Sequence, residues 1–368
     1  MLIYNSMILW IGIMALLYSG FTKRNSMYLG YEKQTKVPLI FAVMTFGYII
    51  FWAGVRSGVA DTRTYIEMFN AYPSNLSDVT EFWNSDNKAP GFLLFNILFK
   101  SLVSSDYHLW LMTIAVISGI CVMYVLYQKS EDFFYSAFLF VVTLNFFWMF
   151  NGIRQFLVAA ILFALSDWIK ERKTGLFILA VLLLSTVHYT AIVMIPMYWV
   201  ATGKPFGKKI MLFIAVLLLC VIYIEPFIAA LESSLADTGY SGFSEQFAMD
   251  DGVNPIRVLV MCVTPAVAFV GRKIIAKEND AYINICVNMS VISGGLYFIG
   301  MFTSGILVGR LPIYFELYNL VLLPYLIRNC FKKESSKVMY LLCALGFVVF
   351  YYLQMRGGYY ISDITGLV

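Results

Sequence analysis

Six ionisable side chains stand at the ends of long apolar runs in this sequence, where a charged group is costly to place. They are Arg56, Asp61, Arg63, Arg154, His188 and Arg310. Ionisable residues in or beside membrane-length apolar segments are functional candidates, because a charge in hydrocarbon needs compensation. The planar guanidinium group of arginine binds phosphate oxygens through two parallel hydrogen bonds. Several arginines at one place therefore predict a phosphate or pyrophosphate ligand.

Arg154 and Arg310 have a further property that suits an anion. Each opens an apolar run that is expected to be helical, and a helix N-terminus carries free N–H groups and a partial positive charge. His188 supplies an imidazole that titrates near neutral pH, and Asp61 supplies a carboxylate. Both are candidates for a general base.

Each of these residues also has a simpler structural interpretation. An arginine at the end of a span often anchors the helix in the headgroup region, and a histidine is often a packing residue. Asp61 precedes a helical-looking segment and is compatible with a helix cap or with an ion pair to Arg56 or Arg63. The site is inferred from the whole set, not from any one member.

The composition places these residues in a membrane protein. Of the 368 residues, 60% are apolar and only 13% are charged, whereas soluble proteins average about 25% charged residues. The net charge of +4 comes from short loops, and no basic stretch has the pattern of a nucleic-acid surface. We expect one all-α, polytopic transmembrane domain over residues 1–368 and no nucleic-acid partner.

Apolar runs of membrane length recur along the chain. A hydrocarbon core about 30 Å thick needs about 20 helical residues, and backbone groups in lipid must bond within their own helix. The expected spans are 2–20, 37–54, 107–127, 133–150, 154–169, 174–187, 188–200, 209–229, 255–271, 281–301, 311–327 and 338–354. The first is expected to be a retained span, because it lacks a basic n-region and a cleavage site.

Lysine and arginine in short loops orient such helices with those loops in the cytoplasm. Basic loops follow the spans that end near residues 20, 169, 200, 271 and 327. With these loops inside, both termini and the acidic loops 55–90 and 230–254 fall outside. All six candidate residues then face the outer side, and the tail 356–368 is expected to cap that face.

Two stretches break the pattern of spans. Residues 90–104 are apolar but short for a crossing, so we expect a re-entrant or interfacial helix there. Residues 175–200 lie between two inside loops and must cross twice or not at all. Two half-length helices meeting at 186–188 fit best, and broken helices of this kind often mark a binding site.

The six cysteines are scattered, and the sequence has no CxxC, Cys/His or DxD-type motif. Neither a disulfide framework nor a zinc site is supported. The expected chemistry uses no metal and no cofactor.

Four motifs resemble the signatures of the EpsG family of Wzy-like polysaccharide polymerases. The first is Arg56 followed by Asp61-Thr62, Tyr65 and Phe69; the second is Asn151-Gly-Ile-Arg154-Gln155; the third is Val187-His188-Tyr189-Thr190-Ala191; the fourth is Gly309-Arg310-Leu-Pro-Ile-Tyr314-Phe315. Their order and spacing hold from about residue 40 to about residue 330. Lys88-Ala-Pro90-Gly91 departs from the pattern, because the family commonly has an acidic residue before the short helix, and Glu81 or Asp86 would have to substitute.

The resemblance implies a glycosyltransferase of the bacterial cytoplasmic membrane that makes O-antigen, capsule or exopolysaccharide. Such an enzyme moves a glycan from one undecaprenyl-pyrophosphate carrier to a sugar hydroxyl on another, at the outer face. The pyrophosphate and substrate would be bound by Arg56, Arg63, Arg154, Arg310, Gln155, Tyr65 and Tyr314. His188 or Asp61 would be the catalytic base, with a slight preference for His188. The family also suggests a chain-length regulator as a partner.

Three other functions are compatible with parts of the sequence. A GT-C-like transferase that uses a polyprenyl-phosphate sugar would place an acid in the first outer loop, where Asp61 lies, and a GT-C-like architecture is compatible with the span pattern. A flippase for lipid-linked glycan would distribute basic residues through a central cavity, whereas these cluster at one face. A membrane acyltransferase would pair its histidine with a nearby Asp or Asn, which the sequence around His188 lacks.

Overall fold

The structure is a computed structural model that describes residues 1–29, 36–75, 89–223, 252–305 and 308–367, without the side chains of 23–29. Most of the predicted outer loop 230–254, and the part of loop 55–90 that holds Glu81 and Asp86, lie outside the described residues.

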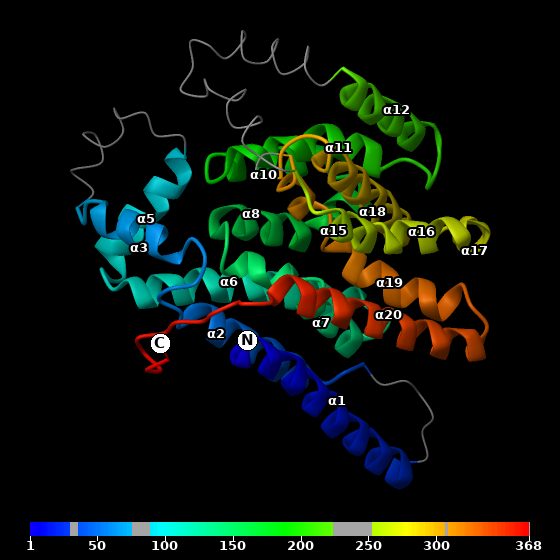
Figure 1. Cartoon of the computed structure of the whole chain (residues 1–368), viewed down its shortest axis with the longest axis horizontal. Coiled ribbons are helices and arrows are strands. Elements are labelled where there is room, and N and C mark those ends of the chain that lie inside the picture. Colours follow the sequence, from blue (N-terminus) through cyan, green and yellow to red (C-terminus); the bar gives the residue numbers. More distant parts are fainter. Residues whose placement is uncertain (30–35, 76–88, 224–251, 306–307, 368) are drawn as a thin grey trace.

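Every regular element in these residues is a helix, which confirms the all-α prediction (Figure 1). The α-helices are α1 (Leu2–Leu29), α2 (Leu39–Gly54), α3 (Thr62–Ala71), α5 (Pro90–Leu102), α6 (Tyr107–Lys129), α7 (Phe133–Val142), α8 (Ile153–Ala164), α9 (Ser166–Lys170), α10 (Thr174–Ser185), α11 (Met194–Ala201), α12 (Lys208–Ile222), α15 (Pro255–Met261), α16 (Val263–Val270), α17 (Arg272–Glu278), α18 (Ala281–Gly300), α19 (Tyr318–Asn329) and α20 (Lys333–Met355). Three 3-10 helices join them, namely η2 (Asn145–Met149), η3 (Tyr189–Val193) and η4 (Leu311–Tyr314).

The number of long helices supports a helical membrane protein but not the twelve spans predicted above. Four described helices (α1, α6, α18 and α20) are long and apolar enough to cross a membrane. The bent pair formed by α15–α16 and α17, with an angle of 63°, would make a fifth span.

The difference arises because hydropathy does not report where a helix breaks. The predicted span 133–150 divides into α7 and η2 on either side of Leu144, which has a φ of 67°. The predicted span 154–169 contains α8, whose 12 residues make a rod about 18 Å long. That length covers little more than half of a hydrocarbon core about 30 Å thick.

The break predicted at 186–188 is confirmed. Helix α10 ends at Ser185, and η3 and α11 return beside it. The hydroxyls of Thr174 and Tyr198 lie 2.6 Å apart, so the start of α10 lies beside α11. His188 therefore stands at the tip of a helical hairpin.

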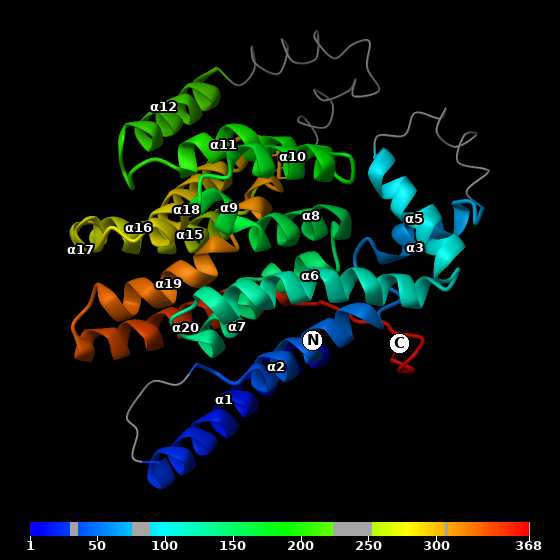
Figure 2. The ribbon, with the colours of Figure 1, turned by 180° about the vertical axis from the view of Figure 1, so that it is seen from behind.

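The short helix predicted near 90–104 is present as α5, which packs with α3 at one end of the molecule (Figure 2). The ammonium of Lys100 on α5 donates to the carbonyls of Phe69 and Asn70 at the end of α3, at 3.1 and 3.2 Å. The N–H of Gly91 donates to the carbonyl of Thr186 at 2.9 Å. A Cβ atom at Gly91 would collide with the Thr186 side chain, so this close approach requires glycine.

The C-terminal segment lies against the loop that follows α2. Ser57 N–H donates to the carbonyl of Ile361 at 2.9 Å, and its hydroxyl donates to Asp363 at 2.9 Å. The Tyr360 hydroxyl donates to the carbonyl of Trp52 at 2.6 Å. The tail therefore braces residues 55–59 (Figure 1, red against blue).

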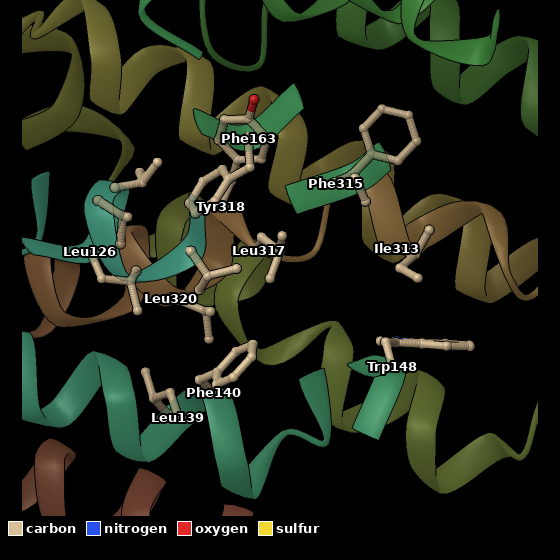
Figure 3. Close-up of a cluster of buried hydrophobic side chains, with 14 of the residues drawn as sticks. Leu126, Leu139, Phe140, Trp148, Phe163, Ile313, Phe315, Leu317, Tyr318 and Leu320 are labelled. Carbon is tan, nitrogen blue, oxygen red and sulfur yellow. The ribbon is translucent and has the colours of Figure 1, made fainter. Parts of the chain in front are cut away.

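The core around α19 supports the segments that enter the site (Figure 3). Tyr318 packs edge-on against Phe163 of α8, with ring centroids 4.9 Å apart. The hydroxyl of Ser136 on α7 donates to the carbonyl of Leu320 at 2.7 Å. Helices α7, α8 and α19 are thus packed together, and α8 carries Arg154 at its start.

The positions of residues at the two ends of the helical bundle predict from which side of the membrane a cysteine introduced there can be labelled. Ser74, beyond α3, and Ser335, near the start of α20, are both exposed. Helix α3 and the start of α20 lie at opposite ends of the bundle (Figure 1). In a background without native cysteines, we expect Ser74→Cys and Ser335→Cys to react with an impermeant maleimide from opposite sides of the membrane. Ser105→Cys, just before α6, serves as a control that should label with Ser74→Cys. Labelling of positions 74 and 335 from the same side would contradict this topology.

Candidate functional site

The hydroxyl of Thr190 joins three segments that are far apart in the sequence. Gln155 on α8 donates to it through Nε2 at 3.3 Å, and the Tyr314 hydroxyl lies 2.9 Å from it. His188 Nδ1 lies 2.8 Å away on the same hairpin tip. Three of the four sequence motifs therefore meet at one oxygen atom.

The hydrogen bonds around Thr190 can be assigned from chemistry. Gln155 Nε2 also donates to the carbonyl of Arg310 at 3.0 Å, and a carbonyl only accepts, so this atom is the amide nitrogen. The Thr190 oxygen therefore accepts from Gln155 and has one proton to give. If it donates to Tyr314, His188 carries its proton on Nδ1 and its Nε2 lone pair is free. If it donates to His188, Nε2 carries the proton instead.

The surroundings of His188 favour its neutral form. Burial lowers the pKa of His188 to about 4, and the nearby charges of Arg154 and Arg310 act in the same direction. The imidazole is therefore uncharged near neutral pH. Its Nε2 has no hydrogen-bond partner within the described residues.

The guanidinium of Arg154 lies against two aromatic rings and makes no hydrogen bond to a described residue. Arg154 is the second residue of α8, and its guanidinium lies 5.4 Å from the Phe92 ring and 5.8 Å from the Tyr65 ring. Its Nε is buried and unbonded, and none of the ion pairs among the described residues includes it. Because a buried charged donor without a partner is costly, this geometry fits a site that an anion completes.

Arg310 lies beside the same imidazole but not at the start of a long helix. It precedes η4, which has four residues and is of the 3-10 type. The expected α-helix beginning at Arg310 is wrong, since α19 starts only at Tyr318. A contribution of the helix dipole is therefore supported for Arg154 and not for Arg310.

Arg56 is a buried clamp, not an accessible ligand. Its side chain is 1% exposed; Nε donates to the Thr62 hydroxyl at 2.9 Å, and another nitrogen donates to the carbonyl of Ala53. Its guanidinium also lies 5.3 Å from the Phe150 ring. Burial lowers the pKa of Arg56 to about 10, which leaves it charged at neutral pH. It joins the end of α2 to the start of α3, and direct contact with substrate is not supported.

Asp61 connects the loop after α2 to the start of α8. Its carboxylate accepts from the N–H of Gly152 at 3.2 Å. It occupies the N-cap position of α3 but makes no capping bond, and it forms no ion pair with Arg56 or Arg63 among the described residues. The described contacts of the His188 imidazole are with Thr190 and Tyr314, not with Asp61.

The remaining predicted ligands differ in accessibility. Arg63 is exposed on α3, whereas Tyr65 is buried under Arg154, and Tyr314 is buried at Thr190.

Other residues in the site were not singled out from the sequence. Thr190 and Phe92 lie within or beside the motifs, so position alone could have suggested them. Glu316 accepts from Trp148 Nε1 at 2.7 Å and from the Tyr297 hydroxyl at 2.6 Å, and it anchors the segment before Gly152. Only its burial and these long-range contacts reveal that role.

Within the described part of the chain, no three His, Cys, Asp or Glu side chains gather as a metal-binding group. The six cysteines are unpaired.

Comparison with known families covers most of the chain. The sequence model of the EpsG family matches residues 39–362, a range that includes all four motifs. No curated protein and no solved structure matches the chain. The chain therefore belongs to the EpsG family, which is associated with polysaccharide polymerases.

Proposed function

We propose that this protein is a polysaccharide polymerase that transfers a glycan from undecaprenyl pyrophosphate to a sugar hydroxyl of a second lipid-linked unit. The observation that carries the proposal is the pairing of Arg154, whose donors are uncommitted, with a neutral His188 held by Thr190. Membership of the EpsG family suggests that the substrate is a glycan. The arginines suggest a pyrophosphate carrier, because guanidinium groups bind phosphate oxygens.

Arg154 and Arg310 would stabilise the leaving group. As the bond between the anomeric carbon and the pyrophosphate oxygen breaks, negative charge collects on the pyrophosphate and positive character on the sugar. Preorganised donors in a site that excludes water act strongly on such developing charge. The rings of Phe92 and Tyr65 keep the Arg154 guanidinium in place before substrate arrives.

His188 would accept the proton of the attacking hydroxyl. The acceptor oxygen forms the new bond to the anomeric carbon, its proton passes to Nε2, and the lipid pyrophosphate leaves with the bonding electrons. This role requires the form in which Thr190 donates to Tyr314 and Nδ1 keeps its proton. A bound pyrophosphate offsets the two arginine charges that lower the pKa of His188, so substrate binding makes it a better base. Asp61 is the other candidate base, since only one bond to its carboxylate is described.

The reaction would occur at the outer face of the bacterial cytoplasmic membrane. The start of α8, which carries Arg154, lies at the end of the bundle that holds α3, α5 and the hairpin tip, away from the basic connections α16–α17 and α19–α20 (Figure 2). His188 stands at that tip, and the carbonyl of Arg310 is bonded to Gln155 of α8. A chain-length regulator would act from this side, and the undecaprenyl chain would lie in the surrounding lipid.

Loss of either arginine is expected to stop polymer growth without loss of the fold. For Arg154→Gln and Arg310→Gln we expect rates about 10²–10³ lower, the usual cost of one oxyanion donor. Purified protein in nanodiscs would be given the lipid-pyrophosphate repeat unit, with chain length and released lipid pyrophosphate as readouts. Arg272→Gln, an exposed arginine on α17, is the matched control. Normal polymer from both site variants would refute the assignment, and lipid movement without new linkages would indicate a flippase.

The pH dependence of polymerisation tests His188 as the base. The base must be neutral, so with a pKa of about 4 the neutral fraction rises through about pH 4 and is nearly complete by about pH 6. We expect kcat/KM of the native protein to be level above about pH 6 and to fall below it. His188→Gln should lower the rate about 10²–10⁴-fold and remove this limb. If the limb persists in His188→Gln and disappears in Asp61→Asn, Asp61 is the base.

Thr190 is expected to act by positioning His188. Thr190→Ser keeps the hydroxyl and should retain most activity, whereas Thr190→Val removes every bond at this point and should lower kcat much more than it raises KM. The comparison uses the same nanodisc assay, with thermal melting to confirm the fold. Equal activity of the two variants would show that the hydroxyl is dispensable.

A further inference from the structure

A cavity is lined by Tyr4 and by the segment 354–359, and we call it the terminal cavity. Its volume is about 340 Å³, within the range of about 300–1,000 Å³ typical of ligand sites. It is lined by Tyr4, Val59, Ala60, Leu144, Phe147, Arg257, Gln354, Met355, Arg356, Gly357, Gly358 and Tyr359. The N-terminal ammonium donates to the carbonyl of Gly358, one of the lining residues, at 2.8 Å.

The terminal cavity shares one segment with the Arg154 site. Val59 and Ala60 line the cavity, while the next residue, Asp61, bonds to Gly152 at the start of α8. Arg56, at the beginning of the same segment, is clamped under Phe150. The segment 56–61 therefore borders both places, and a long ligand could contact both.

The lining of the terminal cavity is positively charged. Arg257 and Arg356 belong to it, and no Asp or Glu does, among the residues that the structure describes. Arg356 is exposed and makes no described hydrogen bond or ion pair. Arg257 hydrogen-bonds to the hydroxyl of Tyr297 and lies near the carboxyl of Glu316, so its charge already has a partner. The guanidinium of Arg356 has no carboxylate beside it in the described lining, which favours an anionic ligand.

The same cavity offers flat apolar surface. Tyr359 is 61% exposed, and Phe147 is half-buried. The Tyr4 hydroxyl donates to the carbonyl of Tyr359 at 2.8 Å, so the backbone that carries this ring is held. Exposed aromatic faces beside charged donors suit a ring that has apolar C–H faces and a charged substituent, as an acidic pyranose has.

Backbone strain is concentrated at this cavity. Ala60 has a φ of 45° and Leu144 a φ of 67°, a region that residues with a side chain rarely adopt. Gly357, with a φ of 81°, lines it as well. Such conformations are unfavourable and cluster at functional sites. Two such non-glycine residues in the lining of the terminal cavity support the view that its shape suits a ligand.

We propose that the terminal cavity binds a sugar unit with a carboxylate, as a second glycan subsite beside the Arg154 site. The carboxylate would pair with Arg356, and the ring would lie on Tyr359 and Phe147. The proposal rests on the proposed function for its glycan. The headgroup of an anionic lipid is the competing occupant, but the aromatic faces and the braced terminal segments favour a sugar.

The probes are methyl β-D-glucuronoside and its neutral counterpart methyl β-D-glucoside, titrated into the full-length protein in phosphatidylcholine nanodiscs and followed by calorimetry or saturation-transfer NMR. We expect the acidic sugar to bind more tightly, and Arg356→Gln and Tyr359→Ala each to weaken it about 10-fold or more, since a charge-assisted bond contributes about 1.5–3 kcal/mol. Arg272→Gln, which removes a charge far from the cavity, should bind as the native protein does. Arg257 is left intact because its substitution would also disturb Tyr297.

Equal binding of the two sugars, or unchanged binding in both cavity variants, would overturn the proposal. So would loss of glucuronoside binding when phosphatidylglycerol is added to the nanodiscs, since the lipid headgroup would then be the occupant. Arg154→Gln should leave glucuronoside binding intact. Selective binding without any polymerisation would defeat the proposed function alone, and polymerisation without selective binding would defeat the subsite alone.

Discussion

The hydroxyl of Thr190 is the contact on which the proposed chemistry depends. It holds His188, Gln155 and Tyr314, and through Gln155 it also fixes the backbone of Arg310. The Thr190 hydroxyl has only one proton, so it can donate either to Tyr314 or to His188, but not to both at once. The direction in which Thr190 donates therefore decides whether His188 presents a base or a donor at Nε2. Substrate charge near Arg154 and Arg310 can change that balance without moving the backbone.

The two arginines Arg56 and Arg154, at this end of the bundle, differ in what their side chains contact. Arg56 donates hydrogen bonds to a backbone carbonyl and to the Thr62 hydroxyl. These bonds hold the loop that carries Asp61. Arg154 rests on aromatic rings and keeps its donors free. Because an unpaired buried charge is unfavourable, free donors are found where a ligand compensates them. The two arginines have the same chemistry but different surroundings, because Arg56 is buried with bonded partners and Arg154 Nε has none.

Part of the site could be predicted from the sequence, and part could not. The break at 186–188 followed from the positions of basic loops and from the length of the run, and α5 followed from its short apolar stretch. The number of spans was overestimated, because hydropathy treats α7 and η2 as one run although Leu144 interrupts them. Glu316 was visible only as a charge near a helix, and its bonds to Trp148 and Tyr297 depend on elements far apart in the sequence.

The sequence by itself determined that this is a helical membrane protein, because so few charged residues cannot cover the surface of a soluble protein of this size. It also marked the arginines and the histidine beside apolar runs as candidates, because a charge there needs compensation. It also carried the EpsG motifs in order. Only the tertiary structure decided which of those residues meet. Packing of α8, the hairpin and η4 places Arg154, His188 and Arg310 together, whereas it buries Arg56 and leaves Arg63 exposed. Burial and hydrogen bonding depend on neighbours from distant segments, and no local pattern specifies them.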